Sequence, residues 1–86
     1  MIDSFIRYLE FEKRLSKHTL IAYQGDLLQF QSFLKNTYET DDISTANYGM
    51  VRSWVAQLVE EKNEPRSVNR KIASLRAFFK FLMRQG

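Results

Sequence analysis

The chain contains no cysteine, a single histidine, one proline and three glycines among its 86 residues. Without cysteine it can form no disulfide, no thiolate nucleophile and no cysteine-ligated zinc site, and one histidine excludes a histidine-rich metal site. No run of eighteen apolar residues is present, and no apolar segment with small-residue cleavage signals follows Met1. We therefore expect a cytoplasmic protein that does not enter a membrane.

Sequence motifs for catalysis are also missing. The chain has no glycine-rich phosphate loop and no histidine placed to activate a serine nucleophile. His18, near the start of an expected helix, is interpreted as a solvent-exposed or capping residue. The sequence therefore predicts no catalytic residue, no metal and no cofactor in this chain.

Apolar material, in contrast, is sufficient for one core. Hydrophobic residues make up 44% of the chain and aromatic residues 14%, including seven phenylalanines. A chain of this length falls in the single-domain range, where a core can form without disulfides or metals. We expect one domain over residues 1–86, and because the sequence ends directly after an expected helix, we expect it to be a fragment of a longer protein.

Hydrophobic periodicity predicts an all-α fold. Apolar residues recur at steps of three and four in four segments, and no segment shows a convincing strand pattern. The expected helices cover about residues 2–14, 17–36, 46–62 and 67–84. Short connections between amphipathic helices favour a compact four-helix bundle, which we expect to consist of two crossed helix pairs.

Capping residues and breakers place the expected helix boundaries. Ser16 precedes the second helix, Ser44 or Thr45 the third, and Ser67 the fourth, each of a type that accepts hydrogen bonds from free backbone amides. Pro65 interrupts the chain before the fourth helix because proline lacks an amide proton and disfavours helix in the preceding residue.

The buried faces follow from the same spacing. Trp54 and Phe79 could stack on bases, but their helical positions favour core packing. Gly25 lies within the second helix at a cost of about 1 kcal/mol relative to alanine, which a close contact on that face could explain. The expected apolar stripes include Leu20, Ile21, Tyr23, Leu27, Leu28, Phe30, Phe33 and Leu34 in the second helix, Val51, Trp54, Val55, Leu58 and Val59 in the third, and Val68, Ile72, Leu75, Phe79 and Leu82 in the fourth.

Charge is distributed unevenly along the chain. The net charge of +3 divides into +1 for residues 1–38, −4 for residues 39–61 and +6 for residues 62–86. An amphipathic helix with a basic outer face is suited to bind a polyanion, and nucleic acid is the commonest such partner.

Basic and small polar residues gather in the first turns of the second and fourth helices. Such side chains make hydrogen bonds to phosphates and base edges, and the positive helix end adds to their attraction for phosphate. A solvated surface with two helix caps is an equally good interpretation of composition alone. As surface substitutions, Arg70→Ala and Lys71→Ala should each weaken DNA binding and change stability by about 0.5 kcal/mol or less. The residues of these first turns are Lys17, His18, Thr19 and Gln24 in the second helix and Arg66, Ser67, Arg70, Lys71 and Ser74 in the fourth.

Two runs of sequence resemble a known family. The run LSKHTL at residues 15–20, followed by AY at 22–23, DL at 26–27 and Phe30, is similar to the second helix of the N-terminal, SAM-like core-binding domain of tyrosine recombinases, the Xer and phage integrase family. The run SVNRKIASLR at residues 67–76, with FFKFL at 78–82, is similar to the fourth helix of that domain. The resemblance extends over essentially the whole chain.

The resemblance implies a four-helix domain that forms half of a C-shaped clamp around duplex DNA, with a catalytic domain as the other half. It implies that the second and fourth helices face the major groove. At the helix starts that the charge pattern also indicates, it selects Lys17, Thr19, Arg66, Ser67, Arg70, Lys71 and Ser74. The family typically has a basic residue at the position of Gly25. Because glycine has no side chain to replace it, the resemblance does not support a phosphate or base contact at this position. The family's catalytic tyrosine, arginines and histidines belong to the other domain. This chain alone should therefore not cut DNA, whereas the parent protein should be a site-specific recombinase that forms a phosphotyrosine intermediate and a tetramer on DNA.

Two other functions remain compatible with the sequence. A SAM-type protein interaction module would explain the fold and the absent catalytic motifs, and it would associate with a protein in a salt-insensitive way without DNA affinity. A basic amphipathic fourth helix could also bind a membrane surface or calmodulin. That role would require the helix to leave the bundle, against its apolar contacts.

Overall fold

The computed structural model describes residues 1–85 and consists there of four α-helices and one short 3₁₀ turn. The helices are α1 (Ile2–Phe11), α2 (Lys17–Tyr38), α3 (Tyr48–Glu60) and α4 (Pro65–Gln85), and the 3₁₀ turn η1 covers Ile43–Thr45. No strand occurs in this part of the chain. The all-α, four-helix prediction is confirmed.

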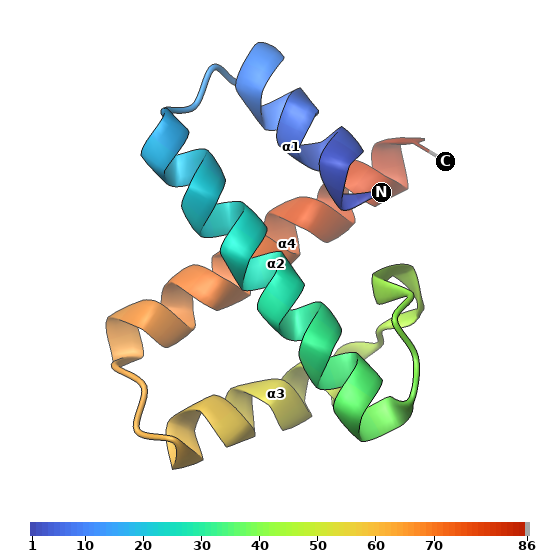
Figure 1. Cartoon of the computed structure of the whole chain (residues 1–86), viewed down its shortest axis with the longest axis vertical. Helices are drawn as coiled ribbons and strands as arrows, with labels where there is room; N and C mark the ends of the chain where they lie inside the picture. Colours follow the sequence, from blue (N-terminus) through green and yellow to red (C-terminus); the bar gives the residue numbers. More distant parts are fainter. Residues whose placement is uncertain (86) are drawn as a thin grey trace.

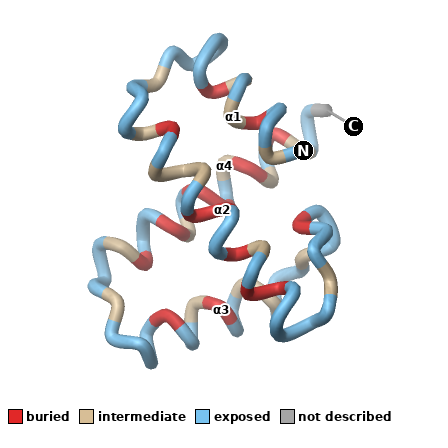
Figure 2. The backbone as a smooth tube through the Cα atoms, viewed as in Figure 1, coloured by how far each residue is buried: buried red, intermediate tan, exposed pale blue. Residues whose placement is uncertain are grey.

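The two longest helices, α2 and α4, cross near the middle of the molecule, as Figure 1 shows. Helix α1 packs beside the first half of α2 and the end of α4, while α3 packs on the other side of the crossing. The first turns of α2 and α4 both lie on the left side of Figure 1. Buried residues occur on all four helices, including the segments of α2 and α4 near the crossing (Figure 2).

Large aromatic side chains fill the centre of this core. Phe5, Phe30, Trp54 and Phe78 are each at most 1% exposed, and the rings of Phe30 and Trp54 lie 5.0 Å apart. The expected core packing of Trp54 is therefore confirmed. Phe79 is only partly buried and packs against the core through an edge contact with Phe78.

The apolar stripe of α2 is narrower than predicted. Ile21 and Leu28, which we expected to widen it, are 60% and 46% exposed, and on α3 Val59 is 61% exposed. The reason is geometric for α2, because the elements that pack on it, α1, η1, α3 and α4, do not cover the positions of Ile21 and Leu28. Periodicity marks the apolar side of a helix, but the neighbouring helices decide how much of it is covered.

The boundaries of α2 are close to those predicted. The Ser16 side chain accepts a hydrogen bond from the backbone amide of Thr19 at 3.3 Å, which confirms Ser16 as its N-cap. The helix continues two residues beyond the expected end and stops where Glu39 adopts a left-handed backbone conformation with φ of 59°.

Helix α3 begins later than predicted, and its cap differs. Asn47, not Ser44 or Thr45, caps it by accepting a hydrogen bond from the amide of Met50 at 3.0 Å. A Cβ atom at Gly49 would lie 3.3 Å from the Asn47 side-chain oxygen, so the glycine leaves room for this cap. Ser44 belongs to η1, which is itself capped by Asp42.

Helix α4 begins at Pro65, so the prediction that Ser67 caps it is wrong. The carbonyl of Glu64 accepts the first helical hydrogen bond, from the amide of Val68 at 3.0 Å, and proline is well suited to the first helical position because its missing amide would have no partner there. Gly86, which we expected to follow the helix end, lies outside the described residues.

Candidate nucleic-acid interface

A buried carboxylate joins α2 to α4 where they cross. Asp26, in the middle of α2, is only 1% exposed and accepts hydrogen bonds from three side chains of α4. Arg70 donates two hydrogen bonds to the Asp26 carboxylate, from Nε to Oδ2 at 3.1 Å and from Nη2 to Oδ1 at 2.8 Å. Lys71 Nζ donates to Oδ1 at 3.1 Å, and Ser74 Oγ donates to Oδ2 at 2.8 Å. Both carboxylate oxygens are thus fully used.

The three donors come together because of their spacing on α4. Positions three and four apart share one face of a helix, so Arg70 and Ser74 stack on the side that meets α2, with Lys71 beside them. Lys71 also donates to the side-chain oxygen of Gln29 at 2.6 Å, and Ser74 is near the carbonyl of Arg70. Every buried polar side-chain atom in the described residues has a partner.

This network corrects part of the sequence prediction. Lys71 is 8% exposed and Ser74 is fully buried, so the expectation that they lie on the surface is wrong. The expectation of a negligible stability effect therefore loses its basis for Lys71, because its ammonium group is buried against Asp26. Periodicity placed both residues outside the apolar stripe, and only the neighbouring helix covers them. Asp26 forms ion pairs with both Arg70 and Lys71.

The network also changes the acidity of Asp26. Burial alone would raise the pKa of this carboxyl group, but hydrogen bonds from Arg70, Ser74 and Lys71 together outweigh it, so the pKa lies below its ordinary value of 3.8. The hydrogen bond between Arg70 and Asp26 in turn raises the pKa of the Arg70 guanidinium. Asp26 is therefore the ionised centre of a site with two cations around one anion.

This lowered pKa makes the fold sensitive to acid. Because folding favours the ionised form of Asp26, its stabilising contribution is fully present above pH 3.8 and is lost as the pH falls through the lower pKa of the folded state. We expect the carboxyl carbon of Asp26 to titrate in NMR spectra with a midpoint below 3.8, and the urea midpoint to fall over the same pH range. A carboxyl titration at or above the ordinary value would contradict the network.

The remaining candidates occupy different environments. Arg66 and Lys17 are exposed in the first turns of α4 and α2, and the Arg70 side chain is 47% exposed despite its bonds to Asp26. Ser67 is half-buried. Thr19 is half-buried too, and its hydroxyl lies 3.0 Å from that of Ser16, so it takes part in the cap of α2.

Gly25 stands beside this cluster with an open face. A Cβ atom placed there would meet no atom within 4 Å, so packing inside the protein does not require glycine. The expectation of a close contact on that face thus has no counterpart within the described chain. His18 is exposed, as expected.

One feature that sequence reasoning missed concerns Tyr8. The Tyr8 hydroxyl accepts a hydrogen bond from Arg84 at 3.0 Å, and Lys13 Nζ lies 5.9 Å from the centre of its ring. Arg84 is 76 residues away in the sequence, so no local pattern could have indicated this pair.

The fold and this site define a small helical module with a basic face, and its described residues include no cluster of acidic, histidine or cysteine side chains that could hold a metal ion. Comparison with known sequences gives the class. Residues 2–86 match the model of the phage integrase N-terminal SAM-like domain, and the chain belongs to this family.

Curated relatives are named as recombinases. The chain is 40% identical to tyrosine recombinase XerC of Oceanobacillus iheyensis and 40% identical to tyrosine recombinase XerD of Listeria monocytogenes, over 99% and 100% of its own length. It is 35% identical to XerD of Rickettsia bellii. The chain spans 27% to 29% of the length of these relatives. No solved structure gives a significant match.

Proposed function

We propose that the chain is the DNA-binding domain of a site-specific tyrosine recombinase and that it holds duplex DNA on the first turns of α2 and α4. The observation that carries this proposal is Arg70, a half-exposed guanidinium held in one orientation by a buried carboxylate. A fixed guanidinium presents its remaining donors without losing further side-chain freedom, which favours hydrogen bonding to phosphates and base edges.

Neighbouring cations support the same function. Arg66 stands one turn before Arg70 on α4, and Lys17 opens α2 on the same side of the molecule (Figure 1). Amides at the two helix starts add positive potential there. In this arrangement Arg66, Lys17 and Arg70 contact DNA, Thr19 and Ser67 lie next to them, and Lys71 and Ser74 act indirectly by holding Asp26 and thereby Arg70.

The relatives support a proposal for the rest of the parent protein. Since the chain spans little more than a quarter of proteins named tyrosine recombinases, we propose that a catalytic domain accompanies it and closes the clamp around DNA. The parent would act as a tetramer on two DNA sites, through a phosphotyrosine intermediate. We propose no cofactor for this domain.

Binding of this domain to DNA should depend strongly on salt. About four to six phosphate contacts give a slope of log affinity against log salt of roughly −4 to −5. Titration of a fluorescent duplex at several salt concentrations measures this slope. Arg66→Gln and Lys17→Gln should each weaken binding and reduce the slope by about 0.9, whereas Arg52→Gln on the exposed face of α3 should change neither. Absence of binding at low salt would reject the proposal.

A protein interaction module remains the second candidate, and one observation favours it. Ile21 and Leu28 are exposed seven residues apart on one face of α2, which suits an apolar partner. Binding to a protein would be insensitive to salt and would be lost in Ile21→Ser, whereas DNA binding would persist in that variant. The membrane or calmodulin alternative would require α4 to expose Leu75 and Phe78, which are at most 2% exposed in the bundle.

The domain alone should form no covalent adduct with DNA. Tyr8 has cationic neighbours, but a nucleophile must also lose its hydroxyl proton to a base. No carboxylate or histidine is among the residues that line the pocket beside Tyr8. Incubation with a nicked suicide substrate, followed by a denaturing gel, should show no shifted band for the native chain or for Tyr8→Phe. A band that disappears in Tyr8→Phe would contradict the assignment of this domain to binding alone.

A further inference from the structure

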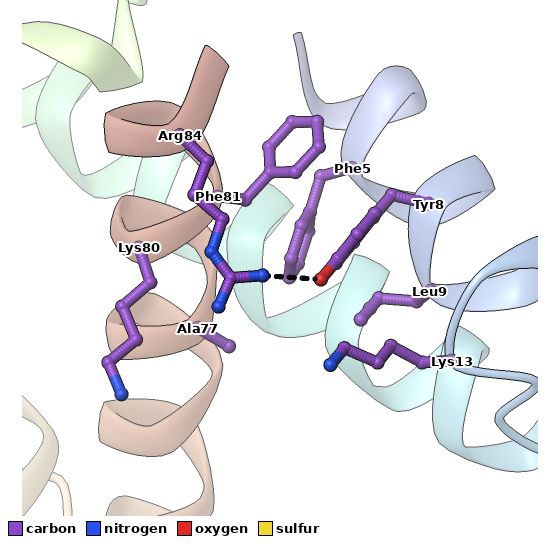
Figure 3. Close-up of a pocket in the computed structure, with 8 residues that line it drawn as sticks. All are labelled: Phe5, Tyr8, Leu9, Lys13, Ala77, Lys80, Phe81 and Arg84. Atoms are coloured by element: carbon purple, nitrogen blue, oxygen red, sulfur yellow. Dashed lines mark hydrogen bonds between the residues drawn. The ribbon is translucent and has the colours of Figure 1, made fainter. Parts of the chain in front are cut away.

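A pocket of about 210 Å³ lies between α1 and the end of α4. Phe5 and Leu9 contribute to its apolar floor, and Lys13, Lys80 and Arg84 stand around it. In Figure 3 the side chains of Lys13 and Arg84 approach the space from opposite sides, with the Tyr8 hydroxyl between them. The pocket lies far along α4 from the Arg70 site.

The polar groups of this pocket are donors. Lys13, Lys80 and Arg84 carry three positive charges, no acidic residue lines the space, and neither ion pair of the described residues involves these cations. The Tyr8 hydroxyl accepts the bond from Arg84, which leaves its own proton free to donate. Three cations and one hydroxyl donor around an opening are the complement of an anion, and of phosphate oxygens in particular.

The pocket also continues a basic stripe. With 3.6 residues per turn, positions 66, 70, 73, 77, 80 and 84 fall on one side of α4, and four of these six residues are Lys or Arg. Arg66, Lys80 and Arg84 are exposed. The two positions without a charge are alanines, Ala73 and Ala77, whose short side chains do not protrude between the cations. The stripe is about 27 Å long. Cations spread over this length suit an extended polyanion better than a single acidic side chain.

We propose that the pocket of Lys13, Lys80, Arg84 and Tyr8 binds a backbone phosphate of duplex DNA, so that the DNA surface runs along all of α4 and reaches α1. This site is additional to the first turns of α2 and α4, and it rests on the proposed function. Arg84 and the two lysines contact the phosphate oxygens, while Tyr8 orients the Arg84 guanidinium and donates its own proton. The charged groups stay near the opening because burying them against the apolar floor would cost solvation energy.

The test compares two double variants with the same change of charge. Lys80→Gln with Arg84→Gln removes two cations of the pocket, and Arg7→Gln with Arg52→Gln removes two exposed cations on α1 and α3. Each is titrated with fluorescent duplex DNA at several salt concentrations. The pocket variant should lose about tenfold or more in affinity, with a salt slope less negative by about 2, and the control should change by less than about twofold. Tyr8→Phe should weaken binding while leaving the slope unchanged, because no charge is removed.

The outcomes separate this site from the proposed function. If Arg66→Gln weakens binding but the pocket variant behaves like the control, the pocket proposal is wrong and the proposed function stands. If the native chain does not bind DNA at low salt, both are wrong. If the pocket variant changes only self-association in analytical ultracentrifugation, the occupant is an acidic surface of a second copy and the phosphate proposal is again wrong.

Discussion

Replacing Asp26 with asparagine is expected to reduce the free energy of unfolding by about 3 to 5 kcal/mol, the largest effect of any single polar substitution in this chain. The variant keeps the size of the side chain but removes the charge that compensates Arg70 and Lys71. Lys71 then remains as a buried ammonium group without an anion, since its side chain is only 10% exposed. For a domain of this size, such a loss lowers the thermal midpoint by more than about 12 °C.

Matched variants test whether the charge is the cause. Asp41→Asn makes the same chemical change at an exposed loop position and should change the free energy of unfolding by less than about 0.5 kcal/mol. Lys71→Met, which removes the buried ammonium, should recover part of the stability when combined with Asp26→Asn. Thermal unfolding followed by circular dichroism measures all three. Equal midpoints for Asp26→Asn and Asp41→Asn would show that the network contributes nothing to stability.

Leu75→Ala is expected to destabilise the bundle by about 2 to 5 kcal/mol. Leu75 is 2% exposed on the core side of α4, so truncation removes apolar contacts and leaves a cavity between the crossed helices. Leu28→Ala is its control, because Leu28 is 46% exposed on α2 and should change stability little. Urea unfolding of both variants gives the difference directly. Similar effects of the two substitutions would mean that the α2 and α4 faces are wrongly assigned.

DNA affinity provides a second readout for the same variants. If Asp26 acts by holding Arg70, then Asp26→Asn should weaken DNA binding even at temperatures where the variant is folded. Leu75→Ala should bind normally under such conditions, because it leaves the basic face unchanged. Arg70 is thus a contact residue in this proposal, and Asp26 is a positioning residue.

Local chemistry in the sequence predicted much of the fold correctly. Spacing of three and four identified all four helices, and Ser16 was a reliable cap because a cap depends on residues three positions apart. Ser67 was misassigned because Pro65 takes the first helical position and leaves Ser67 inside α4. The start of α3 was misassigned because Ser44, Thr45 and Asn47 all precede it. Only the backbone path selects which of them accepts a free amide, as Asn47 does here.

The sequence by itself determined an all-helical domain, its family and a strongly basic C-terminal segment, because these depend on composition, periodicity and local motifs. The tertiary structure alone decided the role of each cation. Arg70, Lys71 and Ser74 lie 44 to 48 residues from Asp26 in the sequence, and Arg84 lies 76 residues from Tyr8. Such pairs form only where helices cross, so helical periodicity could not distinguish a basic residue that faces solvent from one held by a buried carboxylate.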